Sequence, residues 1–358
     1  MKDSEIQTII ERVTREVGET LPATAAATAA THVLSRAETP VLSGAEVAVS
    51  PHHQAPPQPS SSAGDNGVFP TLDEAVAAAG AAFRQLNTLP LEIRKHMVAH
   101  MRQAGREYAQ VLAEMAHSES GMGRVADKVL KNILNADKTL GVEDLETAAW
   151  SGDGGLTITE YAPYGIIGAL TPSTNPTSTV ICNAIAMVAA GNAVTFNAHP
   201  STKDASNHTV QILNQAIQKA GGPANLLTAV ANPTIESATG LMQHKAVRLL
   251  TVTGGAAVVR AAMRSGKRAV CAGPGNPPVV VDETADIEQA GRDVVIGGSF
   301  DNNIVCTTEK EAIVVDTICD ELIQVMTHNG AVKLNSWQFN RLWKAVTTKD
   351  RGPRKYAD

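Results

Sequence analysis

The chain has 358 residues, of which 43% are hydrophobic and 18% are charged, a composition typical of a globular protein with about two domains. It carries 30 Lys and Arg against 36 Asp and Glu, so no basic surplus exists for nucleic-acid binding, and aromatic residues at 3% offer no platform for stacked bases. Its four cysteines have no CxxC or CxxH spacing, which excludes a disulfide-dense scaffold and disfavours a zinc site.

The sequence gives no sign of a membrane span or a secretory signal. No run of about 18 apolar residues occurs, and the first 17 residues carry charges throughout. None of the histidines has a convincing metal-ligand spacing. We therefore expect a cytosolic protein with reduced thiols, no membrane attachment, no nucleic-acid partner and no bound metal.

The first 66 residues differ in character from the rest. Residues 1–17 predict a short amphipathic helix, because their branched aliphatic side chains share one face: Ile6, Ile9, Ile10, Val13 and Val17. Residues 18–66 are rich in Ala, Ser, Thr and Pro, lack aromatic residues, and predict a flexible linker. A helix on a long linker is typical of a docking tag, although a helix packed on its own globular body would give the same pattern.

From residue 67 to 272 the pattern predicts an α/β domain with a doubly wound parallel sheet. Three amphipathic helices are expected first, over 71–86, 91–118 and 127–140. Strands are then expected at 164–170, 193–197, 226–230, 247–252 and 268–272, with helices between them that include 177–190 and 201–220, the latter capped by Ser201. Strands that alternate with helices form a parallel sheet, which binds ligands beyond the carboxyl ends of its strands.

Residues 273–358 predict the start of a second α/β domain. Its expected strands lie at 279–281 and 310–315, and its expected helices at 287–297 and 317–328. Residues 335–358 have weak periodicity and predict no element.

Two loops at predicted strand ends have the composition of a ligand site. Residues 171–176 are polar and lead into a helix, whose free N–H groups suit an anion or an oxyanion, although a proline-stiffened turn would look the same. Thr253, Gly254 and Gly255 also precede a helix, and two glycines let a pyrophosphate approach the backbone. This turn matches neither the G-x-G-x-x-G fingerprint nor a P-loop, so it is weak evidence by itself.

A third loop, residues 301–308, contains a candidate nucleophile. Cys306 lies among polar residues just before an apolar strand. The other cysteines, Cys182, Cys271 and Cys319, fall in predicted helices or at a strand end and are interpreted as small apolar side chains. His199 differs from the other histidines because it follows a strand end, where the sheet would bind a ligand.

Six motifs along the chain are informative in combination. They are Ala-Pro-Tyr-Gly at 162–165, Thr-Pro-Ser-Thr-Asn-Pro at 171–176, Ala-Ala-Gly-Asn at 189–192, Thr-Gly-Gly at 253–255, Gly-Pro-Gly-Asn-Pro-Pro at 273–278, and Ser-Phe-Asp-Asn-Asn at 299–303 followed by Cys306. Together they resemble the aldehyde dehydrogenase superfamily, and more closely the CoA-acylating acetaldehyde and propionaldehyde dehydrogenases of the bacterial microcompartments for ethanolamine and propanediol utilisation. The resemblance runs from about residue 68 to about residue 332.

The resemblance implies roles for particular residues. Cys306 matches the family's nucleophile, and Asn175 matches the side chain that donates to the oxyanion. His199 matches a position near the adenosine ribose, where hydrolytic relatives carry Lys. The implied cofactor-binding residues are Thr171, Pro172, Ser173, His199, Pro200, Thr253, Gly254 and Gly255.

The resemblance also implies an activity, cofactors and partners. A short aliphatic aldehyde, CoA and NAD would react to acyl-CoA and NADH through a thioacyl group on Cys306. Residues 1–17 resemble an encapsulation peptide, which implies docking to shell proteins and a place in the microcompartment lumen. The family's proteins are homo-oligomers when full length, so we expect the same of a full-length chain.

Two departures from the family pattern bear on this expectation. Hydrolytic relatives carry a Glu that activates water in the motif matching residues 269–278, whereas this segment has no carboxylate, which favours thiolysis by CoA. Later motifs of the family's catalytic domain do not occur in the 358 residues, so only the N-terminal portion of that domain is expected. A truncated, inactive cargo or assembly protein is therefore the alternative, and an acyl-phosphate reductase similar to glutamate-semialdehyde dehydrogenase is a third interpretation.

Overall fold

The structure is a computed structural model that describes residues 66–346. The predicted helix over 1–17 and all but the last residue of the predicted linker over 18–66 lie outside the described residues. The described residues belong to one compact unit, Pro56–Asp358. The division predicted between residues 272 and 273 stays a prediction.

Six parallel strands form the main sheet in the order β1-β6-β5-β4-β7-β8. The strands are β1 (Val68–Phe69), β4 (Ile166–Leu170), β5 (Ala193–Asn197), β6 (Leu227–Val230), β7 (Val247–Thr253) and β8 (Arg268–Ala272). The chain moves outward from β4 through β5 to β6 and then returns to place β7 on the other side of β4. The predicted doubly wound sheet is therefore confirmed, and its topological switch point lies at the carboxyl ends of β4 and β7.

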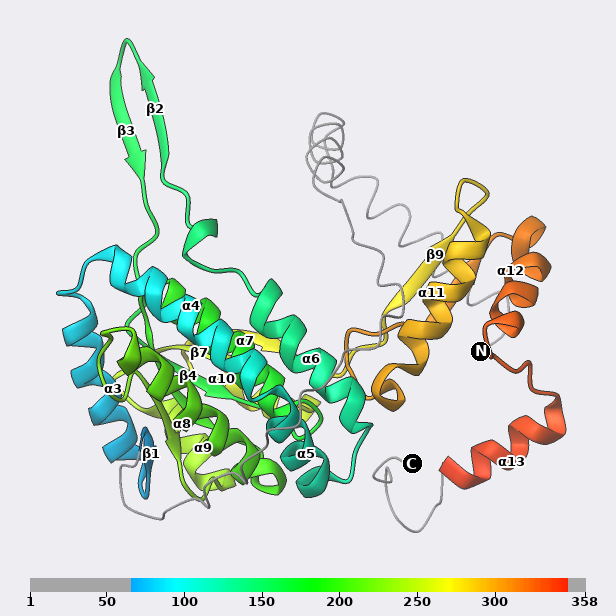
Figure 1. The fold of residues 1–358 in the computed structure, drawn as a ribbon, viewed down its shortest axis with the longest axis horizontal. Coiled ribbons are helices and arrows are strands. Elements are labelled where there is room, and N and C mark those ends of the chain that lie inside the picture. Colours follow the sequence, from blue (N-terminus) through cyan, green and yellow to red (C-terminus); the bar gives the residue numbers. More distant parts are fainter. Residues whose placement is uncertain (1–65, 347–358) are drawn as a thin grey trace. The chain divides into compact units, whose positions relative to one another are not determined.

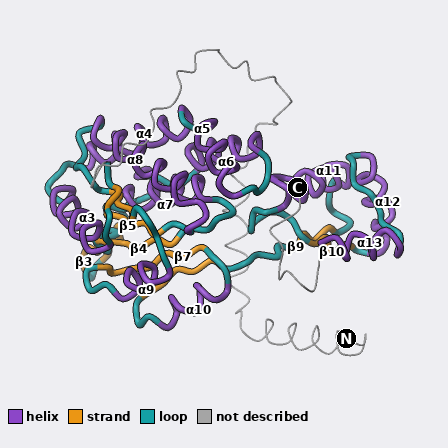
Figure 2. Tube along the Cα trace, turned by 90° about the horizontal axis from the view of Figure 1, so that it is seen from below, coloured by secondary structure: helices purple, strands orange, loops and turns teal. Residues whose placement is uncertain are grey.

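Helices cover both faces of this sheet (Figure 2). On one face lie α7 (Pro176–Ala189) and α8 (Lys203–Lys219), and outside them lie α4 (Leu91–Glu107), α5 (Ala109–Ser120) and α6 (Val125–Lys138). The other face is covered by α3 (Leu72–Leu86), α9 (Ile235–Gln243) and α10 (Ala256–Arg264). This layering explains why every residue of β4, β5 and β6 is buried, as expected for parallel strands covered on both sides.

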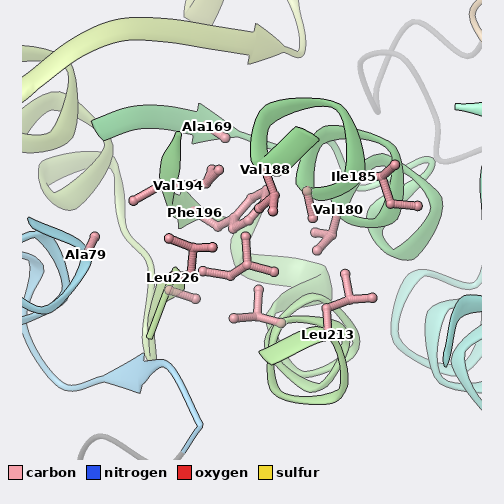
Figure 3. Packing of buried hydrophobic residues seen from close by; sticks show 14 of the residues in the cluster. Ala79, Ala169, Val180, Ile185, Val188, Val194, Phe196, Leu213 and Leu226 are labelled. Carbon is pink, nitrogen blue, oxygen red and sulfur yellow. The ribbon is translucent and has the colours of Figure 1, made fainter. Parts of the chain in front are cut away.

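The core between the sheet and its helices is apolar and closely packed (Figure 3). Phe196 of β5 is 1% exposed and lies among Val188 of α7, Leu213 of α8 and Leu226. The apolar residues of α7 recur at helical spacing, so one face of the helix packs on the sheet while its first residue stays at the sheet's carboxyl edge. Packing of this helix thus fixes the position of the loop that precedes it.

A separate two-stranded parallel sheet follows the main one. It pairs β9 (Pro278–Val281) with β10 (Glu311–Val314), and α11 (Ile287–Ser299) packs on α12 (Asp316–His328). The short helix η3 (Phe300–Asn303) continues from α11 and begins the loop that carries Cys306. The last described element is α13 (Ser336–Val346), within the range where no element was predicted.

Some predicted elements differ from the structure. The helix predicted over 91–118 is interrupted at Tyr108, whose φ of −97° and ψ of 7° join α4 to α5. Ser201 is not the cap of α8, because it lies in the short helix η2 (Pro200–Thr202), where its backbone N–H donates to His199 Nδ1. The hairpin of β2 (Ala148–Gly152) and β3 (Gly155–Thr159), which stands away from the main sheet in Figure 1, was not predicted.

Candidate active site

A cavity of about 630 Å³ opens at the switch point of the main sheet. Its walls come from the carboxyl ends of β4, β5 and β7 and from α9 and α10. Among the residues predicted to bind a cofactor, those that line it are Thr171, Pro172, His199, Pro200, Thr253, Gly254 and Gly255; Ser173 does not. The sequence analysis missed the wall from α9, whose lining residues include Ile235, Ala238 and Met242, because this helix carries no motif.

The cavity could hold a dinucleotide. Gly255 is the N-cap of α10, so the positive end of that helix lies at the cavity wall. A Cβ added at Gly255 would have no neighbour within 4 Å, which leaves the backbone open to a ligand. The Thr171 hydroxyl is buried without a hydrogen-bond partner among residues 66–346, and a polar ligand could supply one. Apolar walls and a helix N-terminus are what an adenine ring and a pyrophosphate require.

Asn175 lies at the N-terminus of α7, where the loop from β4 ends. Its side-chain Oδ1 accepts a hydrogen bond of 2.6 Å from the Lys131 ammonium, and its Nδ2 donates to the Thr174 hydroxyl at 3.0 Å. An ammonium group has only donors, so it must face the amide oxygen, which determines the orientation of the amide. The second Nδ2–H has no acceptor in the described part of the chain and could donate to a ligand oxygen.

The loop before Cys306 has an unusual backbone. Asp301, Asn302 and Asn303 have φ values of 49°, 54° and 58°, in the left-handed region that Asp and Asn tolerate better than other residues with a side chain. Such a run persists only where surrounding contacts hold it. Cys306 follows in a turn and is half-buried.

Lys310 holds this loop from the other side. Its ammonium donates to the backbone carbonyls of Asn303 and Val305 at 2.8 and 3.0 Å, and to the Thr308 hydroxyl at 3.0 Å. Burial lowers the pKa of Lys310, whereas negative charge on Cys306 raises it. The nucleophile loop therefore folds around the Lys310 ammonium, and Lys310 and Cys306 are close enough to interact electrostatically.

The other cysteines lie where the sequence analysis placed them. Cys182 is in α7, Cys271 in β8 and Cys319 in α12. All four cysteines are half-buried, so burial does not separate Cys306 from the rest, and the prediction that the others are small apolar side chains is only partly met. What sets Cys306 apart is its loop and the cation beside it.

Two buried lysines share one buried carboxylate near the loop. Asp301 is fully buried, and its Oδ2 accepts from the ammonium groups of Lys128, at 3.2 Å, and Lys131. Its Oδ1 accepts the backbone N–H of Arg124 at 2.7 Å. Burial and the charge of Lys128 lower the pKa of Lys131 to about 8, while Asp301 opposes this shift. Sequence reasoning missed this cluster.

The spacing of lysines in the sequence of helix α6 could have indicated that they are buried. Lys128 and Lys131 lie one turn apart on the buried face, whereas Leu130 and Leu134 are 55% and 56% exposed. Two lysines at the spacing of a core face predict a buried polar contact, although the sequence does not say with which partner.

The segment that matches the family's hydrolytic motif lies against the nucleophile loop. A Cβ added to Gly275 would overlap the Cys306 carbonyl oxygen, so these two backbones are in close contact. The next residue, Asn276, donates to Glu311 Oε1 at 2.6 Å. No carboxylate occurs within residues 269–278.

Within residues 66–346, no group of three His, Cys, Asp or Glu side chains could hold a metal ion. No helix in the same range is long and apolar enough to cross a membrane.

Comparison with known families decides the identity of the fold. The model of the aldehyde dehydrogenase family matches residues 65–335. The chain belongs to the aldehyde dehydrogenase family. This match contains both the cavity at the switch point and the loop of Cys306.

Similar members of the family include acetylating and CoA-propanoylating aldehyde dehydrogenases. The acetylating acetaldehyde dehydrogenase EutE of Escherichia coli K12 is 51% identical over 285 residues, which cover 79% of this chain and 61% of the relative. Solved structures with a TM-score of 0.76 include two propionaldehyde dehydrogenases. A propionaldehyde dehydrogenase from the Clostridium phytofermentans fucose utilisation microcompartment is 44% identical, with 81% of this chain and 66% of that chain covered. A propionaldehyde dehydrogenase of Rhodopseudomonas palustris with bound CoA and an acylated cysteine is 45% identical, with 81% and 67% covered. The chain thus spans about 61% of the length of the EutE relative.

Proposed function

We propose that this aldehyde dehydrogenase converts a short aliphatic aldehyde, acetaldehyde or propionaldehyde, to acyl-CoA, with NAD as the hydride acceptor. The observation that carries the proposal is the cavity of about 630 Å³, because residues from three separated motifs meet in its wall at the switch point. The 51% identity of the chain to the acetylating acetaldehyde dehydrogenase EutE supports the same reaction. Among residues 66–346, no Lys or Arg lines the cavity, which favours NAD over a dinucleotide with an extra phosphate.

The first half of the reaction forms a thioester on Cys306. The Cys306 thiolate, next to the Lys310 cation, attacks the aldehyde carbonyl carbon, and the carbonyl oxygen becomes an oxyanion. The Asn175 Nδ2–H and the Cys306 backbone N–H donate to that oxyanion. When the oxyanion collapses, the former aldehyde hydrogen departs as hydride, and a thioester remains. Thr171, Gly254 and Gly255 would hold the dinucleotide, which would supply the hydride acceptor when bound.

The second half releases the product. The CoA thiolate attacks the thioester carbonyl, and the same two N–H donors hold the new oxyanion until the Cys306 thiolate leaves. Water competes poorly, because residues 269–278 carry no carboxylate to act as its general base although Gly275 touches the Cys306 backbone. Thiolysis therefore outpaces hydrolysis.

An assay of the whole chain tests this function. Sustained NADH formation from propionaldehyde and NAD should require CoA, the product should be propionyl-CoA by mass spectrometry, and omission of CoA should leave only a single-turnover burst. Cys306→Ala should abolish the burst, and Cys319→Ala, in the helix α12, should keep it. Sustained NADH formation without CoA would contradict thiolysis, and no NADH with CoA present would contradict the activity.

We further propose that residues 1–17 dock the enzyme to the shell of a bacterial microcompartment, in whose lumen it works. The apolar stripe of Ile6, Ile9, Ile10, Val13 and Val17 suits a helix-in-groove contact, and one relative with a solved structure comes from a microcompartment. A fluorescent reporter fused to residues 1–17 should join purified shells, and the same reporter with Ile10→Asp and Val13→Asp should not. A reporter that stays diffuse in shell-forming cells would contradict the docking role.

A further inference from the structure

The hydrogen bond between Lys131 and Asn175 has no role yet in the proposed reaction. Asn175 Oδ1 accepts a hydrogen bond of 2.6 Å from the Lys131 ammonium, and the positive charge of the donor strengthens this bond. The same ammonium also binds the carboxylate of Asp301, five positions before Cys306. One side chain thus contacts both the oxyanion donor and the loop that carries the nucleophile.

The charges around Lys131 do not cancel. Lys128 and Lys131 have side chains that are 3% and 7% exposed, and the buried carboxylate between them belongs to Asp301 alone. Asp127 lies nearby, but it is partly exposed and pairs with Arg124 at 2.6 Å. Two buried cations against one buried anion leave an excess of positive charge directly behind the Asn175 amide. Such an excess is costly unless negative charge develops close to it.

We propose that Lys131 is a positioning residue of the reaction: its ammonium holds the Asn175 amide with Nδ2 toward the reacting oxygen and strengthens that donor by its charge. The role rests on the proposed function, because it needs an oxyanion on a Cys306 adduct. An ammonium bound to the amide oxygen polarises the amide, which makes its N–H groups better donors. The excess charge behind the amide then stabilises the oxyanion more than the neutral aldehyde, which is the requirement for catalysis.

This role makes the acylation step dependent on the protonation of Lys131. The charged groups that face it are Asp127 and Lys128 from α6 and Asp301 from η3, while α7 presents only the neutral Asn175. Burial and Lys128 lower the pKa of Lys131 to about 8, and the two carboxylates raise it. The step should therefore slow as the pH rises above about 8, when the ammonium loses its proton.

The test is the pre-steady-state burst of NADH from aldehyde and NAD without CoA, measured with the whole chain across this pH range. Lys131→Met should slow the burst roughly 10- to 100-fold, the usual effect of losing a charge-assisted hydrogen bond, and should remove the alkaline decline. Lys131→Arg, which stays charged, should restore much of the rate without the decline. In an Asn175→Ala background, Lys131→Met should slow the burst little further, because Lys131 acts through that amide.

Lys128→Met is the matched variant, one turn away on the same helix. It removes the other ammonium bound to Asp301 but keeps the bond from Lys131 to Asn175. Since the charge of Lys128 lowers the pKa of Lys131, its removal should move the alkaline decline to higher pH. NAD affinity depends on the cavity, which neither lysine lines, so it should stay within about twofold of wild type in each variant. An unchanged NAD affinity then shows that the variant is folded.

Three results would overturn this role. The first is a burst rate of Lys131→Met within about twofold of wild type. The second is an equal loss of burst rate from Lys131→Met in the wild-type and the Asn175→Ala backgrounds. The third is an alkaline decline that stays at the same pH in Lys128→Met. A wild-type chain without any burst refutes the proposed function, and the role with it. A wild-type burst that survives Lys131→Met refutes the role alone.

Discussion

Replacing Asp301 by Asn tests how the nucleophile loop is held. The substitution keeps the size of the side chain but removes the carboxylate that neutralises Lys128 and Lys131. Asp301 is fully buried, so water cannot take over its role. We expect a large loss of folding stability, although the substitution only replaces one carboxylate oxygen by an NH2 group.

The magnitude follows from the burial of the three groups. Breaking a buried ion pair by removing one partner costs about 3–5 kcal/mol, because the other charge is left without compensation. Asp301→Asn leaves both the Lys128 and the Lys131 ammonium without a compensating charge. Their side chains are only 3% and 7% exposed, so we expect a cost in the upper part of this range. A protein of ordinary stability, about 5–15 kcal/mol, would lose roughly a quarter of it or more.

The loss should depend on pH in a defined direction. The pKa of Lys131 is about 8 in the folded protein, below its ordinary value of 10.5, so the unfolded chain binds more protons between these values and wild-type stability rises with pH there. Without the Asp301 charge, the pKa of Lys131 falls further, so the rise begins at lower pH in the variant. The difference between variant and wild type is thus largest at low pH and shrinks as the pH approaches 8.

Urea unfolding at several pH values measures this difference directly. Asp137→Asn is a matched control, because it breaks a salt bridge with Arg106 of 2.6 Å whose side chains are 38% and 47% exposed. An exposed pair contributes about 0–1 kcal/mol, so the control should change stability little at any pH. If Asp301→Asn costs no more than Asp137→Asn, or if its effect grows with pH, the account of the buried cluster is wrong.

Gly275→Ala should slow acylation by roughly 10²-fold with little change in NAD affinity, because its Cβ would overlap the Cys306 carbonyl and displace the nucleophile. Gly273→Ala, where a Cβ meets nothing within 4 Å, should be near wild type in burst kinetics, and equal effects would contradict the contact. Thr71→Ala should cost about 1 kcal/mol in urea unfolding, because it removes the capping box that Thr71 forms with Glu74 at the start of α3.

The sequence predicted the parts of the fold whose signals are local. Strands β5 and β8 have the bounds expected from their apolar runs and the turns beside them. The β2–β3 hairpin escaped prediction although Leu156, Thr157, Ile158 and Thr159 of β3 alternate apolar and polar, because nine of the ten strand residues are exposed and the alternation marks no buried face. The apolar residues of α13, among them Trp337 and Trp343, do recur at helical spacing, and the sequence analysis underrated this pattern. In both segments the apolar side chains are exposed in the described chain, so the pattern there does not mark a face packed on the core.

The same division applies to the candidate site. The cavity residues follow strand ends, where glycine, proline and a helix start are adjacent in the sequence, so their pattern could be read. The contacts of Lys131 with Asn175 and Asp301 join residues 44 and 170 positions apart, and no local pattern marks them. Tertiary structure is therefore needed to find the charge that supports the predicted oxyanion donor.

Because Lys131 and Asp301 depend on one another, their combined substitution should cost less than the sum of the two. Asp301→Asn alone leaves two unpaired buried ammonium groups, whereas Lys131→Met/Asp301→Asn leaves only that of Lys128. Replacing buried charges together by groups of similar size is often nearly neutral, so the double variant should recover part of the stability lost by Asp301→Asn. Contacting residues show coupling of about 0.5–3 kcal/mol, which urea unfolding of the four proteins resolves. Strictly additive losses would mean that the ammonium and the carboxylate do not compensate each other, and the charge argument for both the loop and the Asn175 amide would fall together.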